Sequence, residues 1–290
     1  MQTTKEPLNV LIGIDLSEMD TYLFNYIHTL DQILDINKIT FLHNIKITEL
    51  PAGMLSEGRL DVIKDKIISS ITRGINSTAL NHSFEIQVTS ERFSETSFNK
   101  ISESQQFDLL ILGNKQNLRG NGALAYKLVR LFPAPVLLVP ETYNTPIKSI
   151  VQAITFSRYT KAIVDWANKF EINREGNKIE KFPIHVSKLF YYPLMTKREI
   201  ERVTNEDIQA KEKKWANDFP DDQPLKIISA ADKGVASTLY GYAIQQEADI
   251  LILGIKSESK IKDLFIGSVA NELLVRPTNK SMLFIKPTKR

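Results

Sequence analysis

"ADILILGIK" (residues 248–256) and "FDLLILGNK" (residues 107–115) have the same pattern, which occurs twice in this chain of 290 residues. In both, an aspartate precedes an apolar run that ends on a glycine. Short, continuous apolar runs are typical of strands buried on both faces of a parallel sheet. The two runs lie roughly 140 residues apart, a period much longer than that of solenoid repeats, so the pattern indicates a duplicated domain.

The flanking sequence repeats in the same order. "LNVLIGIDLS" (8–17) corresponds to "KSIVQAITFS" (148–157), and "APVLLVP" (134–140) corresponds to "SMLFIKP" (281–287). We therefore predict two domains, residues 1–143 (the first copy) and residues 144–290 (the second copy), joined near the polar stretch 141–148. A chain of this length has room for two domains that each bury a core.

Within each copy, short apolar runs alternate with longer stretches of helical spacing. In the first copy the runs lie at 8–14, 38–43, 84–89, 108–112 and 135–139, and in the second copy residues 196–219 form a long charged helical pattern. Crossovers of this length require parallel neighbouring strands with right-handed connections. The sequence thus predicts a doubly wound α/β sheet in each copy.

In open parallel sheets, ligands bind beyond the carboxyl ends of the strands, where the strand order reverses. The residues expected at these ends are Asp15 and Gly113 in the first copy and Thr155 and Gly254 in the second. These four positions are the first candidates for a binding site.

The segment "GIKSESKIKDLFIGSVANELL" (254–274) follows one of these strand ends. Gly254 leads into a loop containing Lys256, and Gly267 with Ser268 then opens a helical pattern. Glycines let backbone amides approach a ligand, and a helix N-terminus offers unpaired N–H groups to an anion. The loop is therefore either a phosphate site or only a turn.

This segment resembles the signature of the universal stress protein family, Gly-x2-Gly-x9-Gly-Ser/Thr, which wraps the phosphates of ATP in nucleotide-binding members. The order of elements matches in both halves, so the resemblance covers nearly the whole chain. It implies two flavodoxin-like, Rossmann-like domains of five parallel strands in the order 3-2-1-4-5. It also implies that the last strands of the two copies, "PVLLV" and "SMLFI", pair within the chain, as relatives pair between subunits.

Each copy departs from the family pattern at a different place. The second copy has Ser257 for the middle glycine and Thr155 where members carry a nucleoside-binding aspartate. The first copy keeps Asp15, but its loop has Gln116 for the second glycine and fewer residues before Gly122, which Ala123 follows. One copy thus retains the nucleoside carboxylate and the other retains most of the phosphate loop.

Three interpretations remain open. The second copy binds ATP or ADP, with Mg²⁺ accompanying the nucleotide; or the protein has lost nucleotide and acts through protein partners; or it takes another small ligand. The first assigns the phosphates to Gly254, Lys256, Ser257, Gly267 and Ser268, and the nucleoside to Thr155. Asp15, Gly113 and Gly122 are then the remnant of a first-copy site. No cofactor is required for the fold.

Other function classes lack a sequence basis. The chain has no cysteine and no hydrolase, kinase or dehydrogenase motif, and its four histidines lack metal-ligand spacing, so we expect neither an enzyme nor a metal site. A formal net charge of +3 does not favour nucleic-acid binding. No apolar run is long enough to span a membrane and no signal-peptide pattern opens the chain, so a cytoplasmic stress-response protein is expected, with a further homodimer left open.

Overall fold

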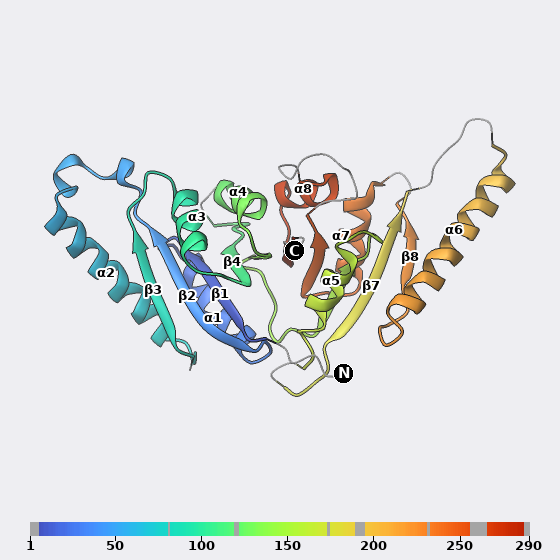
Figure 1. Ribbon diagram of the computed structural model, residues 1–290, viewed down its shortest axis with the longest axis horizontal. Coiled ribbons are helices and arrows are strands. Elements are labelled where there is room, and N and C mark those ends of the chain that lie inside the picture. The colour runs from blue at the N-terminus through green and yellow to red at the C-terminus, as the bar shows by residue number, and fades with distance from the viewer. Residues whose placement is uncertain are drawn as a thin grey trace.

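The computed structural model describes residues 6–80, 82–118, 122–172, 175–188, 195–230, 233–255 and 266–286. The strands in these residues form one ten-stranded sheet in the order β3-β2-β1-β4-β5-β10-β9-β6-β7-β8. The first five come from the first copy and the last five from the second, and the two halves flank a central junction (Figure 1). Each half has the predicted strand order 3-2-1-4-5, which confirms the fold class.

The elements lie close to their predicted positions. In the first copy they are β1 (Leu8–Ile14), α1 (Met19–Asp31), β2 (Ile36–Asn44), the short 3-10 turns η1 (Ile47–Glu49) and η2 (Ala52–Met54), α2 (Glu57–Asn76), β3 (Phe84–Thr89), α3 (Ser94–Ser104), β4 (Leu109–Gly113), α4 (Ala123–Leu131) and β5 (Val136–Val139). In the second copy they are β6 (Ser149–Ala153), α5 (Thr160–Ala167), β7 (Glu180–Ser187), α6 (Lys197–Asp218), β8 (Lys226–Ser229), α7 (Val235–Gln245), β9 (Ile250–Gly254), α8 (Ser268–Val275) and β10 (Ser281–Ile285).

The burial of the central strands explains why their sequences are continuous apolar runs. Every residue of β5, β6 and β10 is buried, with no alternation between faces, so both faces of the central sheet are covered. The outer strands β3 and β8 are only half-buried, and the long helices α2 and α6 lie at the two ends of the molecule (Figure 1). Helix α6 begins with a capping box formed by Thr196 and Glu199.

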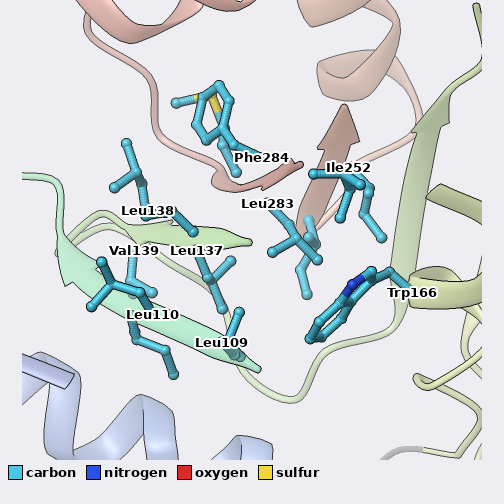
Figure 2. Packing of buried hydrophobic residues seen from close by; sticks show 14 of the residues in the cluster. Leu109, Leu110, Leu137, Leu138, Val139, Trp166, Ile252, Leu283 and Phe284 are labelled. Atoms are coloured by element: carbon cyan, nitrogen blue, oxygen red, sulfur yellow. The ribbon is translucent and has the colours of Figure 1, made fainter. Parts of the chain in front are cut away.

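The junction between the copies is the antiparallel pair β5–β10, the only antiparallel pair among the strand pairs of the described residues. Leu137 lies opposite Leu283, and Val136 opposite Phe284. All four side chains are fully buried, and Figure 2 shows Leu137 and Leu283 facing each other within one continuous apolar cluster. The predicted pairing of "PVLLV" with "SMLFI" is therefore confirmed. It removes two apolar sheet edges from solvent.

Polar contacts also cross the junction. The Nζ atom of Lys286, at the end of β10, donates to the main-chain oxygens of Phe132 and Leu128 at the C-terminal end of α4. Tyr126 on α4 donates to Asn271 on α8 at 3.0 Å. The second copy thus supplies a donor at the C-terminal end of α4, where the Leu128 oxygen also accepts from the Phe132 N–H.

No helix within the described ranges is both long and apolar enough to cross a membrane. The polar stretch between β5 and β6 coincides with the predicted linker. Division of the chain between residues 143 and 144 stays a prediction.

Candidate functional site

A cleft of about 130 Å³ opens at the carboxyl ends of the second copy's strands. Thr155 follows β6 and Gly254 ends β9, and the start of α8, with the N-cap Gly267 and the first helical residue Ser268, faces them across the cleft. The topology brings these four predicted residues together because β6 and β9 are parallel neighbours at the point where the strand order reverses. The remaining wall is mostly apolar, from Ile154, Ile184, Val186, Val235, Leu239 and Leu253.

The start of α8 determines which backbone donors face the cleft. Gly267 is the N-cap, and its own N–H donates to the Ile255 main-chain oxygen at 2.6 Å. Ser268 is the first helical residue rather than the cap, and no side chain caps this end. A helix leaves the N–H groups of its first turn without partners inside the helix, so those of Ser268 and Val269 suit an anion better than that of Gly267.

The end of β6 carries a hydroxyl pair in place of a carboxylate. Thr155 is exposed, and its Oγ1 lies 2.8 Å from the Ser157 Oγ. Between them, Phe156 has a left-handed backbone, with φ of 53°, as does Leu16 at the same place in the first copy, with φ of 60°. A non-glycine residue in this region costs about 1–2 kcal/mol, and such strain concentrates at binding sites.

His185 on β7 lines the cleft beside Thr155. Its Nδ1 lies 2.8 Å from the Ile154 main-chain oxygen, and His43 makes the same contact with Ile14 at 2.9 Å in the first copy. Because a carbonyl only accepts, Nδ1 carries the proton. Burial holds the pKa of His185 below its ordinary value of 6.5, so the ring is neutral at pH 7 and its Nε2 is an acceptor. The contact repeats in both copies, which indicates that the two histidines have a structural role.

The glycines that end β4 and β9 have a packing role. A Cβ on Gly254 would lie 3.0 Å from the Tyr159 Cγ, and a Cβ on Gly113 would lie 2.4 Å from the Met19 Cγ. Tyr159 and Met19 occupy equivalent places after the first strand of each copy. Both glycines are therefore required by close packing, whether or not a ligand is present.

In the first copy the predicted site residues are engaged within the protein. Asp15 accepts from Ser17 and pairs with Lys115, whose Nζ lies 2.5 Å from the Asp15 Oδ2. Burial acts to raise the pKa of Asp15, but the hydrogen bonds from Lys115 and Ser17 hold it below 3.8. Gly122 has a left-handed φ of 61° as the N-cap of α4, and it is exposed.

Sequence reasoning missed Lys115 and Glu141, both of which close the first-copy site. Glu141 follows β5 and accepts hydrogen bonds from the loop after β4. No short-range pattern marks either contact, because the partners lie 100 and 24 residues apart. The repeat could have identified Tyr159 and Met19 as equivalent packing residues, because they align when the two copies are compared in sequence.

Two predicted phosphate-site residues, Lys256 and Ser257, lie outside the described residues. Their assignment stays a prediction. Within the described ranges, no group of three or more histidine, aspartate or glutamate side chains could hold a metal ion.

No protein-family model matches the chain, and no curated protein sequence matches it. Solved structures do match the chain. A universal stress protein from Archaeoglobus fulgidus DSM 4304 has a TM-score of 0.64 and 16% identity, with 97% of this chain and 96% of that chain covered. A protein of unknown function from Pseudomonas aeruginosa PAO1 has a TM-score of 0.64 at 13% identity, covering 97% and 93%.

These similarities extend over nearly the full length of each partner, so they include both copies and the junction between them. They agree with the strand order and the β5–β10 pairing. The chain has the fold of the universal stress proteins, present twice along its length.

Proposed function

We propose that this protein is a universal stress protein whose second copy binds an adenine nucleotide, ATP or ADP, without turning it over. In this role it would act as a sensor or regulator in a stress response. One observation carries the proposal: the cleft where Thr155 and Gly254 face the start of α8.

The two ends of this cleft suit the two ends of a nucleotide. The apolar wall from Ile184, Val186 and Leu239 suits a flat base. The N-terminus of α8 suits a phosphate, because its unpaired N–H groups and the helix dipole favour negative charge. The sequence adds Lys256, Lys260 and Lys262 to the segment that precedes this helix.

The volume of the cleft limits what it holds by itself. A cavity of roughly 150 Å³ admits a molecule the size of benzene, and drug-sized ligands use clefts of roughly 300–1,000 Å³. The 130 Å³ between the described residues suits a base or a similar ring. Under the proposal, the phosphates lie beyond it, at the first turn of α8.

A specific observation favours a second candidate function, a protein-interaction module that has lost nucleotide. In the first copy, other side chains of the protein already occupy the expected site: Lys115 pairs with Asp15, and Glu141 binds the loop after β4. If the second copy has diverged in the same way, its cleft is a remnant and its surface loops carry the function.

Calorimetric titration with ATP, ADP and inorganic phosphate distinguishes the two. Nucleotide binding predicts one site per chain and a higher midpoint of thermal unfolding, since a ligand at about 100 times its Kd stabilises the folded state by about 2.7 kcal/mol. Absence of heat and of a thermal shift at millimolar nucleotide would support the interaction module instead.

Ser268→Glu tests in this titration whether phosphate binds at the start of α8. A glutamate in the first turn stabilises a helix through the dipole, yet it repels a phosphate at the same place. We expect it to weaken ATP binding at least about tenfold while the unfolding temperature stays the same or rises. Ala123→Glu makes the same change at the first residue of α4 in the first copy, and we expect it to leave ATP binding unchanged.

A further inference from the structure

The carboxylate of Glu141 lies in a ring of backbone donors in the first copy. The Gln116 N–H donates to both carboxylate oxygens, at 3.1 and 2.9 Å. The N–H groups of Asn117 and Leu118 donate to Oε1, at 2.5 and 3.3 Å. Successive backbone N–H groups that converge in this way form an anion-binding nest, the same device that holds phosphates in proteins.

The side chain is held there as an anion. Burial acts to raise the pKa of Glu141, but the hydrogen bonds from Asn117, Gln116 and Leu118 together hold it below 4.5. At neutral pH the nest is therefore filled by a full negative charge. Glu141 is only half-buried, so its position borders solvent.

The nest lies where the repeat places a ligand loop. Gln116 stands three residues after Gly113, as Ser257 stands three residues after Gly254 in the second copy. On the other side of this loop, Lys115 is largely buried and pairs with Asp15. In the first copy, the carboxylate of Glu141 thus occupies the anion site, and Asp15 pairs with the adjacent cation, Lys115.

The loop is also fastened to the other copy. The Gln116 Oε1 accepts from the Thr278 N–H at 2.7 Å, and the Gln116 Nε2 donates to the Asn114 main-chain oxygen at 2.9 Å. Asn114 in turn donates to the Val139 oxygen at the end of β5, two residues before Glu141. The loop is therefore held in its nest conformation from both sides of the junction.

We propose that loop 114–118 is an anion-binding site for a phosphate group, and that Glu141 occupies it as an internal anion. A tethered side chain competes at a local concentration in the millimolar range, so free phosphate reaches the nest only when Glu141 is removed. This proposal does not depend on nucleotide binding in the second copy, because it concerns different residues.

The test is a titration of inorganic phosphate followed by the backbone amide signals of Gln116 and Asn117 in the full-length, isotope-labelled protein. In Glu141→Ala, we expect these signals to shift with phosphate and to saturate, with an apparent affinity at least about tenfold tighter than in the wild type. Glu91→Ala serves as the matched control, because it removes one carboxylate, paired with Lys100, from the same copy.

Glu141→Gln keeps the shape of the side chain without its charge, and it remains informative if the alanine variant is unstable. We expect it to give an intermediate phosphate affinity, because a neutral amide oxygen is a weaker acceptor than a carboxylate. The proposal is overturned if the folded variants show no phosphate-dependent shift at residues 116 and 117. Equal shifts in the wild type would overturn it as well, because Glu141 would then not be in competition.

Discussion

The ring of Tyr159 lies directly against Gly254, so closely that a Cβ on this glycine would come within 3.0 Å of the Tyr159 Cγ. Tyr159 is buried at the start of α5, and Gly254 ends β9 beside the cleft. The contact connects the wall of the cleft to the core of the second copy. The shape of the cleft wall at this point therefore depends on a residue that has no side chain.

Gly254→Ala should destabilise the protein by about 1–3 kcal/mol, because overpacking forces Tyr159 away from its position. Urea unfolding followed by circular dichroism measures this change. Gly241→Ala is the matched control, since Gly241 lies in α7 with open space where its Cβ would be. Alanine there should leave stability unchanged or raise it by up to about 1 kcal/mol. Equal effects of the two substitutions would contradict the packing role.

Gln152 is a buried polar residue in the middle of β6. It has no exposed surface, and neither its Oε1 nor its Nε2 has a hydrogen-bond partner. The equivalent residue of the first copy is Ile12, also fully buried. Because an unsatisfied buried amide costs about 1–3 kcal/mol, Gln152→Ile should raise the free energy of unfolding by a similar amount. Chemical denaturation tests this, with Ile12→Gln expected to lower stability. A loss of stability in Gln152→Ile would show that the amide has a partner in solution.

Lys286 should stabilise the junction between the copies. Its Nζ supplies a donor to carbonyl oxygens at the end of α4, and methionine would keep the length of the side chain without the donor. Of these acceptors, the Leu128 oxygen keeps the Phe132 N–H as a donor, whereas the Phe132 oxygen would lose the lysine. Because burial lowers the pKa of the Lys286 amine to about 7, the buried lysine carries a desolvation cost of its own, and the effect expected of Lys286→Met is local: faster hydrogen exchange at the end of α4. Lys226→Met, on the edge strand β8, should leave this exchange unchanged, and unchanged exchange in Lys286→Met would contradict this role.

Asp20 should make stability depend on pH. It is buried at the start of α1, and burial, reinforced by the nearby charge of Asp15, raises its pKa from 3.8 to about 7. The folded state therefore binds this proton more tightly than the unfolded state does. The stabilisation is fully present below about pH 3.8 and is lost as the pH rises through about 7.

Asp20→Asn removes this titration. Between pH 4 and 7, the free energy of unfolding of the wild type should fall more steeply than that of Asp20→Asn, measured by urea denaturation at each pH. Asp165→Asn changes an exposed carboxylate that pairs with Lys161, and it should keep the wild-type slope. Parallel curves for the wild type and Asp20→Asn would contradict the raised pKa.

The fold could be predicted from the sequence because its determinants are local and repeated. The apolar runs that end on Gly113 and Gly254 define equivalent strands, and strand order then brings Thr155, Gly254 and the start of α8 to one edge of the sheet. The pairing of β5 with β10 was implied by the family resemblance, and it covers two apolar strands that would otherwise remain exposed.

The side chains that occupy the expected site of the first copy could not be predicted in this way. The pair formed by Lys115 and Asp15, and the carboxylate of Glu141 in its nest, depend on rotamers and loop geometry. Sequence spacing indicates a loop able to bind an anion, but it does not say which anion fills it. The same limit applies to Gly254. From the sequence alone, a bound ligand and close packing against the Tyr159 ring explain a glycine at this position equally well.

The most direct test of the central claim is a crystal structure of the protein grown with ATP or ADP. The account predicts density for a nucleotide in the second copy, with its base beside Thr155 and His185 and its phosphates at the first turn of α8. It also predicts Glu141 in place in the first copy. An empty cleft at saturating nucleotide, or a nucleotide bound elsewhere, would contradict it.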